Sequence, residues 1–288
     1  MPRNRSFFAT LRVIGSVQMF HFVQHDKDNE VLVLKVGLYK KCHFFPNMSI
    51  FRKFWAAYAV ILFLLLMTLS LPVLLIFMAF TPGERALRNN IYYLHHIFTP
   101  LFLLLAGIRL KVEGREKIEQ KQSYVIVGNH SSSLDFITHA HAFPGVFRFL
   151  AKQELQKIPV FGWVVKKMCL IVDRSSAMSR ARSVVALKQH LADGWSIFIY
   201  PEGSRNKTDD PLGPFYDGAF RIAIQTKAPV AVETIVNMSK IASGYGLRPG
   251  VVRIVWDEPI PTDGMTAEDI PALKERVEQM MRGHLQAG

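Results

Sequence analysis

Cysteine is scarce in this sequence, which has only Cys42 and Cys169 among its 288 residues and no C-x-x-C spacing. Neither a disulfide framework nor a cysteine zinc cluster is indicated, and a reducing, cytoplasm-facing compartment fits this usage. The G-x-S-x-G turn that presents a serine nucleophile is also missing. The sequence therefore offers no candidate side chain for a covalent intermediate.

Acidic residues are outnumbered, with 23 Asp and Glu against 35 Lys and Arg and a formal net charge of +12. This balance favours anionic partners: a lipid head group, a membrane surface, an acidic carrier protein or nucleic acid. The positive charge is dispersed and no nucleic-acid-binding module is recognisable, so we expect no nucleic acid partner.

Repeats and low-complexity tracts are absent, and 288 residues suit one catalytic unit with an appendage. Apolar residues make up 50% of the chain and the mean hydropathy is +0.16, which implies more apolar surface than one core needs. A phospholipid membrane is therefore an expected partner. Residues 1–50 show no sustained period and stay an unassigned N-terminal extension.

Two apolar segments follow this extension and are expected to form membrane-anchoring helices within residues 51–109. The first, Trp55 to Phe80, contains no charged residue and exceeds the roughly 20 residues that a helix needs to cross a bilayer core. Pro72 lies inside it and is expected to kink a spanning helix or to mark one that dips into the membrane. The second segment, Ile91 to Ile108, includes Pro100 and is expected to be a companion helix.

Basic residues flank the first apolar segment on both sides, so the distribution of positive charge leaves its orientation open. They are Lys40, Lys41, Arg52 and Lys53 before it, and Arg85 and Arg88 after it. Two arrangements remain: one spanning helix with an interfacial companion, or a helical hairpin anchored in one leaflet. We favour the hairpin, with the catalytic domain facing the cytoplasm.

Residues 110–288 alternate short apolar runs with longer helical periods, which predicts an α/β catalytic domain. We expect a mixed, largely parallel sheet flanked by helices. The expected strands are Leu110–Val112, Tyr124–Val127, Arg148–Ala151, Leu170–Val172, Ser196–Tyr200, Val230–Ile235 and Val251–Trp256. The expected helices are Leu134–His141, Val160–Met168, Met178–Ala192, Gly218–Thr226 and Ala267–His284.

The segment Asn129-His130-Ser131-Ser132-Ser133-Leu134-Asp135 places a histidine at the end of a strand and an aspartate on the first turn of the next helix. This offset allows the carboxylate to accept one imidazole N–H, which leaves the other ring nitrogen to take a proton from a hydroxyl. Taken alone, such a pair is more typical of a cap or of a hydrogen-bonded core histidine.

A second strand end runs into Pro201-Glu202-Gly203-Ser204-Arg205. Such a turn exposes backbone N–H groups, and the arginine adds a planar fork that suits phosphate oxygens. An anion-binding turn is indicated, although an ordinary turn with a solvated arginine has the same composition.

Together the two segments resemble the glycerol-phosphate and lysophospholipid acyltransferase family, whose first motif is Asn-His-x-x-x-x-Asp and whose third is Pro-Glu-Gly-Thr/Ser-Arg. The joint match is highly specific, extends from about Val112 to about Pro259, and is nearest to the 1-acylglycerol-3-phosphate acyltransferases. Ala151 to Leu155 and Ile171 to Ser175 resemble the middle motif region of the family in order and spacing.

The resemblance implies direct acyl transfer, with His130 as general base on the acceptor hydroxyl and Asp135 orienting it. It implies no metal and no cofactor. The residues that would bind the acceptor phosphate are Arg205, Lys152, Arg174, Gly203 and Ser204. The residues that would support the two motifs are Asn129, Pro201 and Glu202.

The fourth motif departs from the family, in which it is commonly an apolar strand with two prolines. Here Ala228-Pro229-Val230-Ala231-Val232-Glu233 keeps only the first proline. The departure leaves the identity of the acceptor and the selection of the acyl chain open. Ser204, where threonine is common, is a chemically mild change.

The resemblance implies that acyl-CoA or acyl-carrier protein donates an acyl chain to the sn-2 hydroxyl of lysophosphatidic acid, which gives phosphatidic acid. Two alternatives stay open. One is another acceptor: glycerol 3-phosphate, another lysophospholipid or an aminoacyl lipid precursor. The other is a membrane protein that binds anionic lipid without catalysis. His139 and His141 could suggest a metal pair, but no carboxylate or cysteine stands at a matching helical offset, so no metal is expected.

Overall fold

The structure, a computed structural model, describes residues 13–14, 17–24, 33–39, 46–81, 83–158, 160–172 and 177–287. The chain divides into two compact units, residues 1–50 and 51–288. In the first unit, β1 (Val13–Ile14), β2 (Val17–Gln24) and β3 (Val33–Tyr39) form an antiparallel sheet in that order. Both sequence motifs lie in the second unit.

A long helix, α1 (Pro46–Phe80), carries the first apolar segment and continues through Pro72. Its residues Ile50–Phe80 are long and apolar enough to cross a membrane. Two hydroxyls within this run bond back to the helix, Thr68 to the carbonyl of Leu64 and Ser70 to that of Leu66, each at 2.8 Å. Residues 50–80 are therefore a candidate membrane anchor.

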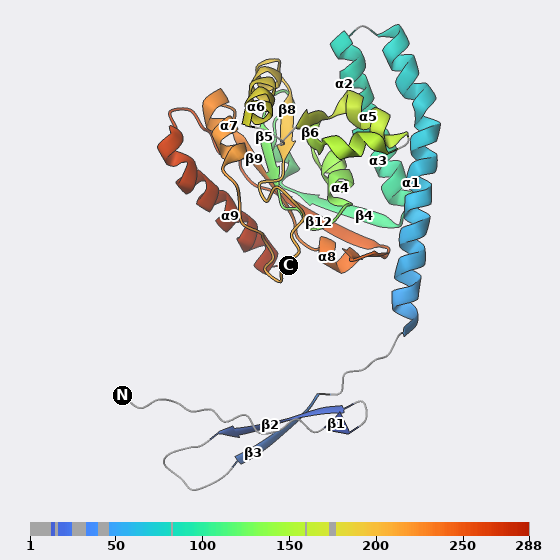
Figure 1. Cartoon of the computed structure of the whole chain (residues 1–288), viewed down its shortest axis with the longest axis vertical. Coiled ribbons are helices and arrows are strands. Elements are labelled where there is room, and N and C mark those ends of the chain that lie inside the picture. The colour runs from blue at the N-terminus through green and yellow to red at the C-terminus, as the bar shows by residue number, and fades with distance from the viewer. Residues whose placement is uncertain are drawn as a thin grey trace. The chain divides into compact units, whose positions relative to one another are not determined.

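The chain returns along α1 through α2 (Gly83–Tyr93), a π-helix η1 (Leu94–Phe98) and α3 (Thr99–Leu105). Near one end of the pair, the indole N–H of Trp55 donates to the carbonyl of Ala106 at 3.0 Å. Near the other, the hydroxyls of Ser70 and Tyr93 lie 3.0 Å apart. These contacts define the expected helical hairpin, whose two arms lie side by side in Figure 1.

The second arm of the hairpin differs from the expected helix at both ends. It begins at Gly83 and not at Ile91, because the polar residues of this turn form an amphipathic helix that buries Ala86 and Asn90. It ends at Leu105, after which Gly107, at φ +71, turns the chain into a strand that starts at Ile108. The hairpin and the sheet belong to one compact unit. The boundary proposed at residue 109 therefore separates an anchoring segment from a catalytic one, and it does not separate two compact units.

A seven-stranded sheet in the order β4-β12-β9-β5-β8-β6-β7 forms the centre of the second unit. All neighbouring pairs are parallel except β9 with β12. The predicted mixed, largely parallel sheet is confirmed, with each predicted strand within two residues of its observed bounds. These are β4 (Ile108–Glu113), β5 (Val125–Gly128), β6 (Phe147–Lys152), β7 (Leu170–Val172), β8 (Ser196–Ile199), β9 (Val230–Ile235) and β12 (Gly250–Trp256).

The five predicted helices are present as α4 (Asp135–Ala142), α5 (Phe161–Met168), α6 (Ala177–Ala192), α7 (Gly218–Thr226) and α9 (Ile270–Gln286). A 3-10 turn precedes α9, and there Thr266 and Asp269 form the capping box that their spacing indicates. The sequence analysis missed an insertion between β9 and β12. It consists of α8 (Met238–Ile241), β10 (Ala242–Ser243) and β11 (Gly246–Leu247).

The sheet is buried on both faces, as expected where parallel strands carry helices on each side. Alternate residues of β5 point to opposite faces: Ile126 joins a core that includes Phe102 and Trp256, and Val127 joins one that includes Phe220 and Val277. The first core packs under the helical hairpin and α4, and the second under α6, α7 and α9. Figure 1 shows α7 and α9 on one side of the sheet and α1 to α5 on the other.

Gly114, which follows β4, gives a test of this fold. It has φ +73, and a Cβ there would collide with the carbonyl oxygen of Trp256. We expect Gly114→Ala to lower the free energy of unfolding by more than about 2 kcal/mol, because left-handed strain adds to a backbone clash. Gly264→Ala is the matched control, since Gly264 has φ +79 and no atom within 4 Å of a Cβ. Equal losses in urea or thermal unfolding would contradict the packing at Gly114.

Candidate active site

The two sequence motifs meet at one edge of the sheet because β5 and β8 are parallel neighbours. Val127 is in register with Ile199, so both strands end at the same edge. The backbone N–H of His130 donates to Oε1 of Glu202 at 2.7 Å, and the backbone N–H of Asn206 donates to the carbonyl of His130 at 2.7 Å. The tertiary structure thus joins segments separated by about 70 residues in the chain.

His130 and Asp135 form the expected pair, with Nδ1 of the imidazole 2.9 Å from Oδ2 of the carboxylate. Asp135 is fully buried at the start of α4, whereas the side chain of His130 is 19% exposed. The same Oδ2 accepts the backbone N–H groups of Ser131 and Ser132, each at 2.7 Å. An ionised carboxylate accepts hydrogen bonds and donates none, so Nδ1 of His130 carries the proton of this bond. In the neutral imidazole, Nε2 is then the nitrogen that can accept a proton.

Tyr200 holds the His130 ring from its face. The ring centroids lie 3.9 Å apart and the planes differ by 15°. Burial, with the nearby carboxylates of Asp135 and Glu233, raises the pKa of the Tyr200 phenol well above its ordinary value. The ring is therefore a neutral stacking partner that fixes the imidazole orientation. The sequence analysis missed this role, although an aromatic residue directly before Pro201 was the available signal.

Glu202 lies inside the protein and ties three segments together. Beyond its bond to His130, its Oε2 accepts the backbone N–H of Gly213 at 2.8 Å. Burial raises the pKa of this carboxyl, while the two N–H donors oppose that shift. A Cβ at Gly213 would lie 2.8 Å from the same Oε2, so this close approach requires glycine.

The other expected supporting residues have structural contacts of the same kind. The Asn129 amide donates to the carbonyl of Ile235 at 3.0 Å and accepts its N–H at 2.8 Å, which fastens the first motif to the end of β9. The carbonyl of Pro201 accepts the N–H of Tyr216 at 2.8 Å. Gly203 turns the chain at φ +68 and donates its N–H to Tyr200 at 3.0 Å.

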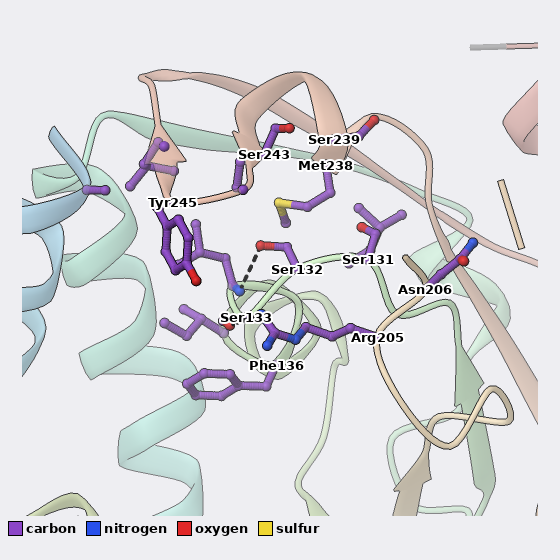
Figure 2. Close-up of a pocket in the computed structure, with 18 of the residues that line it drawn as sticks. Ser131, Ser132, Ser133, Phe136, Arg205, Asn206, Met238, Ser239, Ser243 and Tyr245 are labelled. Atoms are coloured by element: carbon purple, nitrogen blue, oxygen red, sulfur yellow. Dashed lines mark hydrogen bonds between the residues drawn. The ribbon is translucent and has the colours of Figure 1, made fainter. Parts of the chain in front are cut away.

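Arg205 is exposed at the mouth of a pocket, and its guanidinium donates to Oγ of Ser133 at 2.9 Å. Figure 2 shows Arg205 extending toward Ser133, with the Ser131 to Ser133 loop beside it. The side chain of Ser204, its neighbour, is exposed. The cationic guanidinium of Arg205 therefore lies on the same rim of the pocket as the segment that carries His130 and Asp135.

The pocket has a volume of about 1280 Å³ and is polar at one end and apolar at the other. Asn129 and Ser131, on either side of His130, belong to its wall. The insertion after β9 supplies another wall, from which the side chain of Tyr245 extends (Figure 2). The apolar end is lined by Ala59, Val60, Phe63 and Leu64 of α1 with Phe102, Phe136 and Phe161. No pattern in the sequence indicated that the candidate anchor helix would line the pocket.

Two expected phosphate ligands fall outside the description of the site. Lys152 ends β6, but its side chain and the whole of Arg174 lie outside the described residues, as does Cys42. Cys169 is described and half-buried, and burial raises the pKa of its thiol to about 12. A thiol that stays protonated at neutral pH is a poor nucleophile.

His139, one of the two histidines considered as metal ligands, faces a carboxylate. Nδ1 of His139 lies 3.0 Å from Oε2 of Glu233. Within the described ranges, no three His, Cys, Asp or Glu side chains are grouped as ligands of a metal ion would be.

Comparisons with known proteins identify the class of this site. The acyltransferase family model matches residues 109–235. Human 1-acyl-sn-glycerol-3-phosphate acyltransferase beta is 31% identical over 64% of this chain and 68% of its own length. The 1-acyl-sn-glycerol-3-phosphate acyltransferase of Saccharomyces cerevisiae is 30% identical over 64% of this chain and 62% of its own.

A solved structure shares the fold. The crystal structure of the 1-acyl-sn-glycerophosphate acyltransferase PlsC from Thermotoga maritima matches with a TM-score of 0.68 at 22% identity, over 82% of this chain and 97% of that one. The chain belongs to the acyltransferase family, as the two motifs predicted, and is an enzyme of that class.

Tyr200 gives a test of the site geometry. We expect Tyr200→Phe to keep most of the acyl transfer rate, because the ring and not the buried hydroxyl contacts His130. Tyr200→Leu should lower kcat by about tenfold or more, since a loosened His130 imidazole loses its fixed orientation in the site. Initial rates and thermal unfolding of both variants make the comparison. A Leu variant as active as the Phe variant would show that stacking is dispensable.

Proposed function

We propose that this enzyme transfers an acyl chain from acyl-CoA or acyl-carrier protein to the sn-2 hydroxyl of lysophosphatidic acid, which yields phosphatidic acid. The observation that carries the proposal is the His130–Asp135 pair at 2.9 Å beside a pocket that is polar at one end and apolar at the other. The relatives named as 1-acyl-sn-glycerol-3-phosphate acyltransferases support it.

In the proposed reaction, Nε2 of His130 takes the proton of the acceptor hydroxyl as its oxygen attacks the thioester carbonyl. The carbon–oxygen bond forms, and the tetrahedral intermediate then collapses by breaking the carbon–sulfur bond. The imidazolium returns its proton to the leaving thiolate. Asp135 stays ionised throughout and stabilises the imidazolium through Nδ1. No enzyme nucleophile takes part, in keeping with the protonated thiol of Cys169.

Arg205 is proposed to bind the phosphate of the acceptor. Its planar fork matches phosphate oxygens, and its bond to Ser133 holds the guanidinium beside the loop of the first motif. Gly203 and Ser204 are proposed to present the turn to the same phosphate, with Lys152 and Arg174 as further cationic ligands. The formal net charge of +12 suits both an anionic membrane and an acidic acyl carrier.

The hairpin is proposed to lie in one leaflet of the membrane. Along α1, Ala59, Leu62, Met67 and Leu74 are buried against the catalytic domain or the second arm. A helix that is held against the domain at such positions cannot cross the bilayer without carrying polar protein surface into hydrocarbon. Its other face is apolar and exposed, and we propose that it contacts lipid while the catalytic domain faces the cytoplasm. The exposed residues include Ile61, Leu65, Leu69, Leu75, Ile76 and Phe80.

Substitution of the proposed base tests the mechanism. We expect His130→Ala and Asp135→Asn to lower kcat by about 10²-fold or more, because positioned proton transfer contributes on that order. Binding to vesicles that contain anionic phospholipid should be unchanged, since α1 is intact. Transfer is measured with labelled acyl donor and binding by sedimentation of the same preparations. Wild-type turnover in His130→Ala would defeat the mechanism.

A panel of acceptors tests the substrate. We expect faster transfer to lysophosphatidic acid than to glycerol 3-phosphate, lysophosphatidylcholine or monoacylglycerol. Arg205→Gln should raise KM for lysophosphatidic acid about tenfold or more with little change in kcat, because it removes charge-assisted hydrogen bonds of roughly 1.5–3 kcal/mol. Arg276→Gln, at an exposed position on α9, is the matched control.

The outcomes of this panel separate the alternatives. Strong transfer to another acceptor and none to lysophosphatidic acid would refute the proposed acceptor but keep the reaction class. Vesicle binding without transfer to any acceptor would favour a lipid-binding protein. Rates with acyl-CoA and acyl-carrier protein, measured side by side, identify the donor.

A further inference from the structure

A second histidine–carboxylate pair lies directly behind the proposed catalytic pair. His139 stands four residues after Asp135 on α4, so both side chains are on one face of this helix. Nδ1 of His139 is 3.0 Å from Oε2 of Glu233, and both side chains are 0% exposed. Glu233 lies on β9 in register with Gly128, two residues before His130.

The backbone is shaped to hold this second pair. A Cβ at Gly128 would lie 2.8 Å from Cε1 of His139, so the imidazole occupies space that only a glycine leaves on β5. The His139 ring also contacts the Tyr200 ring, with centroids 5.6 Å apart, and Tyr200 in turn stacks on His130. A chain of contacts therefore runs from Glu233 to the proposed base.

Several titratable groups face this region. Asp135 and His139 come from α4, Tyr200 and Glu202 from the segment after β8, and Glu233 from β9. Burial raises the pKa of Glu233, and the charge of Asp135 raises it further, whereas His139 lowers it. An ionised Glu233 without His139 would put a second buried negative charge near Asp135, which is costly in a medium of low dielectric.

We propose that His139 and Glu233 are positioning residues for the acyl transfer proposed above, forming a buried couple without net charge that keeps Glu233 from adding its charge to that of Asp135 beside His130. The couple is neutral whether its proton resides on the imidazole or on the carboxyl. Both side chains are 0% exposed, so neither reaches a substrate, whereas the His130 side chain is 19% exposed. A buried pair of this kind contributes little net stability, because desolvation offsets attraction. Its consequence lies in the electrostatics of the site.

The test is the pH dependence of kcat/KM in His139→Leu and in His139→Leu combined with Glu233→Gln. In the single variant, Glu233 has lost the partner that lowers its pKa, so its carboxyl ionises only where the pH exceeds a pKa that burial and Asp135 raise. Where it ionises, its negative charge favours the imidazolium form of His130. The acid limb of the profile, which is the rise of kcat/KM with pH, should therefore be displaced to higher pH and should extend over a wider pH range than in wild type. In the double variant no charge is left, and the limb should return to its wild-type position. KM for the acceptor should stay unchanged in both.

Two further variants keep the test decisive. His139→Gln retains a polar side chain of similar length without a charge, and it should shift the acid limb in the same direction. It replaces the Leu variant in the test if that variant fails to fold. His284→Leu is the matched control. His284 lies on α9, and its Nε2 is 2.9 Å from Oδ1 of Asp257. The substitution breaks this pair and should leave the acid limb in place. Thermal unfolding of each variant separates lost stability from an altered profile.

A readout that does not need activity completes the design. The ¹³C chemical shift of the His130 imidazole, followed against pH in detergent micelles, should titrate at higher pH in His139→Leu than in wild type. Profiles and titrations that superimpose on wild type would overturn the inference. The two proposals can fail separately. If the wild-type enzyme shows no acyl transfer but the His130 titration still moves in His139→Leu, the proposed function is overturned and the electrostatic role of the pair is supported.

Discussion

Asp135 is a fully buried carboxylate, and the loop around it directs three N–H groups at one of its oxygens. Its Oδ2 accepts the imidazole N–H of His130 and the backbone N–H groups of Ser131 and Ser132. Its place at the start of α4 adds the favourable end of the helix dipole. These donors fix the loop of the first motif, and the loop fixes the direction of His130. The Tyr200 stack, the Glu202 bond and the pocket rim all depend on that loop.

Three parallel strands converge on this loop, and each contributes a different restraint. β5 delivers the motif itself, and β8 delivers Tyr200 and Glu202, which hold the ring and the backbone of His130. β9 holds Asn129 through the backbone of Ile235 and carries Glu233 behind the site. A sheet with these three strands adjacent therefore supports His130 from the face of its ring, from its backbone and from behind. Rigid secondary structure supplies the precision that the proposed general-base chemistry requires.

The helical hairpin, a candidate membrane anchor, also forms part of the pocket wall. One face of α1 packs against the catalytic domain and lines the apolar end of the pocket, while the other face is apolar and exposed. The same helix is therefore suited to contact both the acyl chain of a bound substrate and the surrounding lipid. In the proposed function, this arrangement places the thioester and the lipid hydroxyl near His130 without a passage through water. The indole of Trp55 joins the two arms of the hairpin at Ala106, two residues before β4 begins.

The sequence by itself determined the features that depend on neighbouring residues: seven strands, five helices, the capping box before α9, and the two motifs that assigned the family. The offset from His130 to Asp135 was readable because one loop and one helical turn set it. Tertiary structure alone decided the Tyr200 stack, the bond from Arg205 to Ser133, the pair of His139 with Glu233 and the wall that α1 gives to the pocket. It also decided the start of α2, where buried contacts extend a helix through a polar turn. Each of these joins residues far apart in the chain, and local periodicity carries no information on which distant side chains share a buried space.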